Sequence, residues 1–191
     1  RPWSPDVAVL PWADIDGDRV TMHNIRCCDY RSETEFTVRH HDETFDLSRL
    51  TGVDLFHVFW GSPSIAHTML SFGFDDGRHL CLSVETRREQ GEVYDALKGF
   101  FRQYELIYVF ADETDLVKLR TNFRGEQVYL YPLAVPLDAA RRVLLVVDVG
   151  EHRLQRQPDV PQLRRDPAAR GVHLVADALP AGERRVAVEV R

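Results

Sequence analysis

The feature that most constrains the fold is a short turn between two strand-like segments, "SIAHTMLSFGF" and "RHLCLSVETR". Its residues, Asp75-Asp76-Gly77, are typical of a three-residue hairpin loop in which a type I turn ends on a left-handed glycine. Such a turn pairs Phe74 with Arg78 and thereby sets the register of both strands. Counting back from it predicts three facing pairs: Ser71 with Cys81, Met69 with Ser83, and His67 with Glu85.

The pair of His67 and Glu85 is the candidate site. Facing residues on antiparallel strands share a side of the sheet, with Cβ atoms about 5 Å apart. A carboxylate there would hold the tautomer of the imidazole and raise its basicity, as the third member of a catalytic triad does. The pair can equally stabilise a partly buried strand, and a two-residue Asp-Gly turn would send Glu85 to the other side. A catalytic role and a structural role both stay open.

The other side of the same hairpin carries apolar residues at alternating positions. We expect this side to face the core. Its residues are Leu70, Phe72, Leu80, Leu82 and Val84.

Strand-like segments dominate the first half of the chain, and helix-like segments come later. Predicted strands cover residues 7–26 (two strands joined at Asp16-Gly17), 34–47, 53–61, 105–111 and 126–133. Predicted helices cover residues 91–104, residues 112–123 beginning near Asp112, and residues 137–147 capped by Asp138. The periodicity of the first helix places most of its aromatic side chains in the core. This order predicts an α+β fold with a mostly antiparallel sheet.

The composition allows one core and excludes some partners. A chain of 191 residues, 44% of them hydrophobic, is too short for two full domains. With 24 basic and 30 acidic residues and no basic face, it is not expected to bind nucleic acid. No apolar run is long enough to span a bilayer.

No metal or cofactor site is predicted. Asp14, Asp16 and Asp18 resemble a calcium loop, but Arg19 and Ile25 stand where that loop needs glycine and glutamate. In the stretch from His40 to Asp42, the adjacent histidines of a strand point to opposite sides and cannot easily bind one ion.

The three cysteines lack the spacing of a metal site. Cys27 and Cys28 are neighbours and cannot bridge each other without strain. In an oxidising compartment a disulfide can form between Cys28 and Cys81 or between Cys27 and Cys81. The favoured interpretation is that all three cysteines are small buried hydrophobic residues.

The end of the chain has an unusual alphabet. From Pro132 to Arg191 only ten residue types occur, and each has codons that begin with G or C. A one-base slip in a GC-rich gene would produce this set, and the slipped frame permits Asn-Cys across Gln162 and Leu163. The alternative is a natural tail rich in arginine and proline. We expect one domain over residues 3–147 and a poorly packed tail over 148–191, since no aromatic residue anchors it.

Several stretches resemble one family. "SPDVAVLPWADIDGDRVTMHNIR", "DLFHVFWGSPSIAHTMLSFGF", "SVETRREQGEVYDALKGFFRQYELIYVFADETDLVKLRTNF" and "VYLYPL" are similar to the Lnb N-terminal periplasmic domain family of bacterial envelope proteins. The resemblance covers roughly Trp3 to Leu145. It implies a periplasmic location and a tether to the inner membrane through segments outside this chain.

The resemblance also implies an Asn-Cys segment after the helix that follows "VYLYPL". A histidine strand followed by a cysteine helix resembles circularly permuted papain-like amidases and acyltransferases, in which histidine assists thiolate attack on an acyl group. On this resemblance His67 is the base, Glu85 its orienting group, and their side of the sheet faces the helix near Asp138. No cysteine follows Pro132, so the chain is expected to lack its nucleophile.

Two functions follow as hypotheses. The first is an inactive form of a cysteine-dependent hydrolase or acyltransferase that acts on envelope amides or esters. The second is a non-catalytic binding module that recognises an envelope partner. In either case four arginines are candidates to receive acidic groups: Arg87, Arg88, Arg120 and Arg124.

Overall fold

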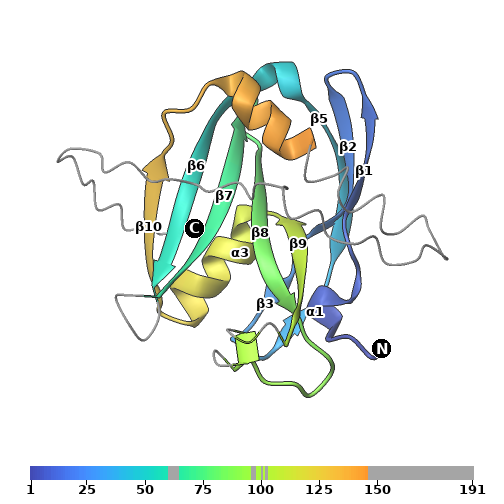
Figure 1. Cartoon of the computed structure of the whole chain (residues 1–191), viewed down its shortest axis with the longest axis vertical. Helices are drawn as coiled ribbons and strands as arrows, with labels where there is room; N and C mark the ends of the chain where they lie inside the picture. Colours follow the sequence, from blue (N-terminus) through green and yellow to red (C-terminus); the bar gives the residue numbers. More distant parts are fainter. Residues whose placement is uncertain (60–64, 96–97, 100, 102, 146–191) are drawn as a thin grey trace.

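One large, curved sheet organises the part of the chain that the computed structural model describes, residues 1–59, 65–95, 98–99, 101 and 103–145 (Figure 1). In this part, strands follow the order β1-β2-β9-β8-β7-β6-β10, and β5 pairs with β2. Their bounds are β1 Trp12–Asp16, β2 Arg19–Arg26, β5 His40–Asp46, β6 Leu50–Phe59, β7 Ala66–Phe74, β8 His79–Arg87, β9 Glu105–Ala111 and β10 Gln127–Pro132.

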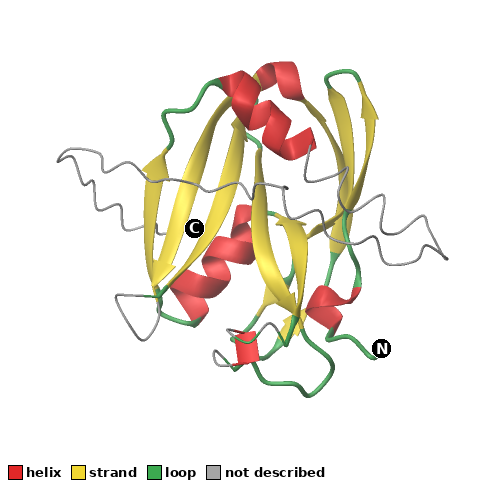
Figure 2. Ribbon diagram, in the orientation of Figure 1, coloured by secondary structure: helices red, strands yellow, loops and turns green. Residues whose placement is uncertain are grey.

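The remaining elements are short. β3 (Asp29–Tyr30) and β4 (Phe36–Thr37) form a separate two-stranded ribbon. The helical elements are α1 Pro5–Ala8, the 3₁₀ turn Leu47–Arg49, α3 Glu113–Lys118 with its π-helical continuation Leu119–Phe123, and residues 137–145 (Figure 2).

The sheet is antiparallel except where β2 meets β9. Those two strands run parallel and share one bridge, between Arg26 and Ala111. The predicted α+β fold with a mostly antiparallel sheet is confirmed. The predicted helix near Asp112 is also confirmed, because Asp112 stands at the N-cap of α3.

The hairpin of β7 and β8 has the predicted turn. Gly77 adopts φ 82°, the left-handed region that glycine tolerates best. The amide of Phe74 donates to the carbonyl of Arg78 at 3.0 Å, which closes a three-residue loop. Met69 faces Ser83 and Ser71 faces Cys81, which confirms two of the three predicted pairs; the ladder between β7 and β8 begins at Met69 and does not include His67 and Glu85.

The first hairpin differs by one residue from its prediction. Asp16 pairs with Arg19, so the loop is Gly17-Asp18 rather than Asp16-Gly17. Gly17 has φ 60°, whereas Asp18 does not enter the positive region. Glycine at the first central position is the mark of a type II′ turn, which matches the twist of the flanking strands.

Each side of the sheet has its own core, covered by a different helix (Figure 1). On one side, Phe72 and Leu82 pack with Ala140 and Leu144 of the helical residues 137–145. On the other side, Met69, Cys81 and Val109 pack with Leu116 and Val117 of α3. Because side chains alternate along a strand, His67 and Glu85 share the second side with Met69.

The predicted helix over residues 91–104 is wrong in extent. Of its described residues only 98 and 99 are helical, and Tyr94 and Phe101 are exposed rather than in the core. The hydroxyl of Tyr104 accepts from the amide of Asp95 at 2.9 Å and donates to the carbonyl of Val93 at 3.3 Å. In a continuous helix these two backbone groups would bond to other backbone groups of the helix. The hydrogen bonds to Tyr104 therefore prevail over the helical spacing of the apolar residues.

The first residues after Pro132 belong to the domain. The amide of Leu133 donates to the carbonyl of Val53 at 2.9 Å, and Ala140 and Leu144 are each 4% exposed. Asp138 lies inside the first helical turn, where it accepts from Arg142, and does not cap the helix. The predicted tail over residues 148–191 lies outside the described residues.

Candidate functional site

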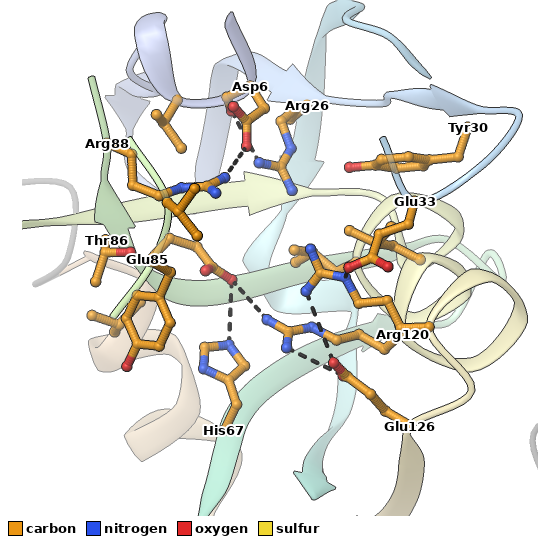
Figure 3. A pocket seen from close by; sticks show the side chains of 17 residues that line it. Asp6, Arg26, Tyr30, Glu33, His67, Glu85, Thr86, Arg88, Arg120 and Glu126 are labelled. Carbon is orange, nitrogen blue, oxygen red and sulfur yellow. Dashed lines mark hydrogen bonds and ion pairs between the residues drawn. The ribbon is translucent and has the colours of Figure 1, made fainter. Parts of the chain in front are cut away.

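A cavity of about 400 Å³ opens on the side of the sheet that α3 covers. We call it the His67 cavity. Strands β7 and β8 supply one wall, and α3 with its π-helical continuation supplies another (Figure 3). Its polar lining includes His67, Glu85, Arg120, Glu126, Arg88 and Asp6.

His67, Ser83 and Glu85 form a hydrogen-bonded group at the wall. Ser83 Oγ donates to Glu85 Oε1 at 2.7 Å, and His67 Nε2 lies 2.8 Å from Ser83 Oγ. His67 Nε2 also lies 3.3 Å from Glu85 Oε1. The predicted juxtaposition of His67 and Glu85 is therefore confirmed, whereas their catalytic role stays a prediction.

The direction of these bonds places a proton on His67 Nε2. The single hydroxyl proton of Ser83 is directed to Glu85, so Ser83 Oγ accepts from the ring. His67 Nε2 then carries the proton, and Nδ1 is the nitrogen on the far side of the ring from Glu85. The side chains of His67 and Glu85 are 16% and 22% exposed, so the pair is partly open.

Arg120 joins this group from the helix. Its Nη2 lies 3.6 Å from Glu85 Oε1, and its Nη1 donates to Glu126 at 3.3 Å (Figure 3). Arg120 stands in the π-helical continuation, where the amide of Arg124 donates to the carbonyl of Leu119 five residues earlier. Such turns within helices are frequent at functional sites, because they redirect a side chain.

The charge of Glu85 is strongly favoured. Burial alone would raise the pKa of Glu85, but its hydrogen bond to His67 and the charges of His67 and Arg120 lower it. The hydrogen bond from Ser83 acts in the same direction, and the pKa falls to about 2. Glu85 is therefore an anion that orients His67, not an acid that donates a proton at neutral pH.

A buried ion pair holds the base of the cavity together. Arg26 Nε and Nη2 donate to the two carboxylate oxygens of Asp115 at 3.0 and 2.7 Å. Burial lowers the pKa of Arg26, but the charge and hydrogen bonds of Asp115 outweigh it and keep that pKa above its ordinary value. The pair connects the end of β2 to α3.

None of the three cysteines lines the His67 cavity, and all are free thiols. Burial raises the pKa of Cys81, and burial together with Asp115 raises the pKa of Cys28 to about 12. The pKa of Cys27 is also raised, by burial first and then by Asp112. Neither candidate disulfide is formed, and no thiol in the chain is activated as a nucleophile.

The expected cover of the site is wrong. The helical residues 137–145 pack on the opposite side of the sheet from His67, against Phe72 and Leu82. Both sides of the β7–β8 hairpin carry apolar residues near its centre, so the hairpin alone does not select which helix covers which side. A reacting group would approach His67 past α3 or through the cavity mouth.

Other expectations about this region also change. Val84 is 45% exposed and does not belong to the core. The four arginines are already paired within the protein: Arg87 with Glu105, Arg88 with Asp6, Arg120 with Glu85 and Glu126, and Arg124 with Glu33. Ser83 was detectable from the sequence, since it shares a side with Glu85 two residues away. Arg120 was named only as a candidate to receive acidic groups, and no neighbouring residue indicated that Glu85 is its partner.

The comparison with known families gives one match. Residues 36–156 match the family described as the Lnb N-terminal periplasmic domain, which is more than half of the chain. No curated protein and no solved structure matches it. Among the described residues, no helix combines the length and apolar character needed to cross a membrane. The matched residues include the strands that carry His67 and Glu85. The chain therefore belongs to the Lnb N-terminal periplasmic domain family and is a periplasmic domain of that type.

Proposed function

We propose that this domain derives from a cysteine-dependent hydrolase or acyltransferase of the cell envelope, with His67 as base, and that this chain lacks the nucleophile. The observation that carries the proposal is the group of His67, Ser83 and Glu85 in a partly open cavity. An imidazole whose tautomer is fixed by a low-pKa carboxylate is suited to accept a proton from a thiol.

In the proposed reaction, His67 takes the proton of a cysteine thiol. The thiolate attacks the acyl carbon of an envelope amide or ester, and the bond to the leaving nitrogen or oxygen breaks. The imidazolium returns its proton to that leaving group. Water or a second nucleophile then releases the acyl group from sulfur. Glu85 stabilises the imidazolium throughout, because its negative charge persists at neutral pH.

The nucleophile is the missing part. The family match continues to residue 156, and Leu133, Ala140 and Leu144 pack on the core. A change of reading frame would therefore lie after residue 156, and the Asn-Cys permitted at residues 162 and 163 would still follow it. In the full-length protein we propose a tether to the inner membrane through segments outside this chain.

The test begins with the gene. If the alternative frame after codon 156 encodes Asn-Cys, the chain with that frame is expressed, and the rate at which iodoacetamide alkylates the cysteine of that pair is measured at pH 7. We expect His67→Ala to slow alkylation by about 100-fold, the lower end of a general base's contribution. His79→Ala is the matched control, because His79 lies exposed on the same hairpin. An unchanged rate in His67→Ala would show that the histidine is not a base.

A second function, a non-catalytic binding module for an envelope partner, is favoured by apolar side chains on the lining of the cavity. Val93 is 80% exposed, Val84 45% and Tyr94 43%. Exposed apolar groups beside a polar cavity suit a ligand with an apolar chain and a polar end. If the alternative frame contains no Asn-Cys, this function replaces the first.

A further inference from the structure

Three metal-binding side chains converge at one end of the sheet, away from the lining of the His67 cavity. They are Cys27, His41 and Asp112, and each offers one ligand atom. The sulfur, the ring nitrogen and the carboxylate oxygen all lie within 4.8 Å of one another. All three side chains are partly exposed, so an ion can reach them from solvent.

The strand register brings these residues together. β2 and β9 run parallel and pair at Arg26 and Ala111, where both strands end. The residues that follow these ends, Cys27 and Asp112, therefore lie side by side. Ile25 of β2 pairs with His41 of β5. Backbone hydrogen bonds hold both ends, since the amide of Asp112 donates to the carbonyl of Arg26 at 3.1 Å and that of Cys27 to Arg39 at 2.9 Å.

The spacing and the ligand types suit a zinc-like ion. Zinc bonds of about 2.0 to 2.3 Å in a tetrahedron separate neighbouring ligand atoms by roughly 3.3 to 3.7 Å. His41 Nε2 lies 3.7 Å from Asp112 Oδ1, and the wider separations need small side-chain rotations. A set of thiolate, imidazole and carboxylate favours zinc over calcium or magnesium, which prefer oxygen alone.

Ion pairing alone accounts for only part of the cluster. His41 Nε2 lies 3.7 Å from both Asp112 and Glu43, as expected for a histidine between two carboxylates. These ion pairs do not involve Cys27, although its sulfur lies within 4.8 Å of the ligand atoms of His41 and Asp112. The neighbouring residue Asp42 is engaged elsewhere, because it lies 2.7 Å from His23 Nδ1.

The geometry points to a binding site for a zinc-type divalent ion formed by Cys27, His41 and Asp112. Three protein ligands leave the fourth position for water or for an exchangeable group. Glu43 offers a further carboxylate oxygen, 3.7 Å from His41 Nε2. The site differs from the run of His40 to Asp42, because its ligands come from the residue after β2, from β5 and from the N-cap of α3.

The purified full chain is reduced and freed of metal by chelation. It is then titrated first with Co²⁺ and afterwards with Zn²⁺. We expect one equivalent of Co²⁺ to give a sulfur-to-cobalt charge-transfer absorption that Zn²⁺ abolishes. Because loss of an outer-shell partner already weakens metal binding 10- to 100-fold, Cys27→Ala, His41→Ala and Asp112→Asn should each weaken it by about 100-fold or more.

Neighbours of the same chemistry serve as controls. Cys28→Ala and His40→Ala should bind Co²⁺ as the unchanged chain does, since neither belongs to the cluster. Circular dichroism checks that each variant folds, and Cys27→Ser replaces Cys27→Ala if the latter does not. Absence of binding below millimolar Co²⁺, or binding that survives all three ligand variants, would overturn the proposal.

Discussion

Asp115→Ala is expected to lower the free energy of unfolding by about 3–5 kcal/mol, the loss typical of removing one partner from a buried ion pair. Asp115 is fully buried, and Arg26 is 6% exposed. The carboxylate accepts both guanidinium bonds and, in addition, the amide of Cys28 at 2.7 Å. Alanine leaves the cation of Arg26 buried without compensation. The measurement is urea denaturation followed by circular dichroism.

Two further variants sharpen this prediction. Arg26→Met combined with Asp115→Leu removes both charges, and we expect it to be more stable than Asp115→Ala alone, because no charge is then buried unpaired. Asp138→Asn is the control, since its pair with Arg142 is exposed and should contribute less than about 1 kcal/mol. A loss below 1 kcal/mol in Asp115→Ala would mean that water enters the pair freely.

Glu85 is expected to make the domain sensitive to acid. Its pKa of about 2 in the folded state lies below the ordinary value of 4.5. A lowered folded pKa stabilises the protein above pH 4.5, and this stabilisation is lost as the pH falls from 4.5 to 2. The difference in pKa corresponds to about 3 kcal/mol at neutral pH, to order of magnitude.

The matched comparison is Glu85→Gln, with unfolding measured from pH 7 down to pH 2. Near neutral pH the variant should be less stable by about 3 kcal/mol, and the gap should close as Glu85 of the unchanged chain becomes protonated. Glu105→Gln is the control, because Glu105 lies on β9 and its side chain is 47% exposed beside Arg87. A gap that stays constant with pH would show that charge on Glu85 does not account for its contribution.

The sequence by itself determined the hairpin and therefore the pair of His67 and Glu85. A three-residue turn ending on Gly77 allows one register, and alternation along two strands then decides which side chains share a side. The α+β class and the start of α3 were predictable for the same reason. Each depends on residues within a few positions of one another, where backbone preferences act directly.

Only the tertiary structure decided what surrounds that pair. Both sides of β7 and β8 carry apolar residues, so either side can be covered by a helix. Residues 137–145 pack on the side opposite His67. Arg120 reaches Glu85 because α3 crosses the sheet there and continues into a π-helical turn. Neither event has a signal in nearby residues.

The same reason explains the cluster of Cys27, His41 and Asp112. It requires β2 and β9 to run parallel beside each other, although more than seventy residues separate them and no turn connects them directly. Tyr94 and Phe101 illustrate the converse, because their helical spacing favoured a buried helix that the hydroxyl of Tyr104 opposes. The residues of the turn set the register of the β7–β8 hairpin. Long-range packing decided which helices lie against the hairpin, because contact between distant segments depends on the free energy of the whole fold.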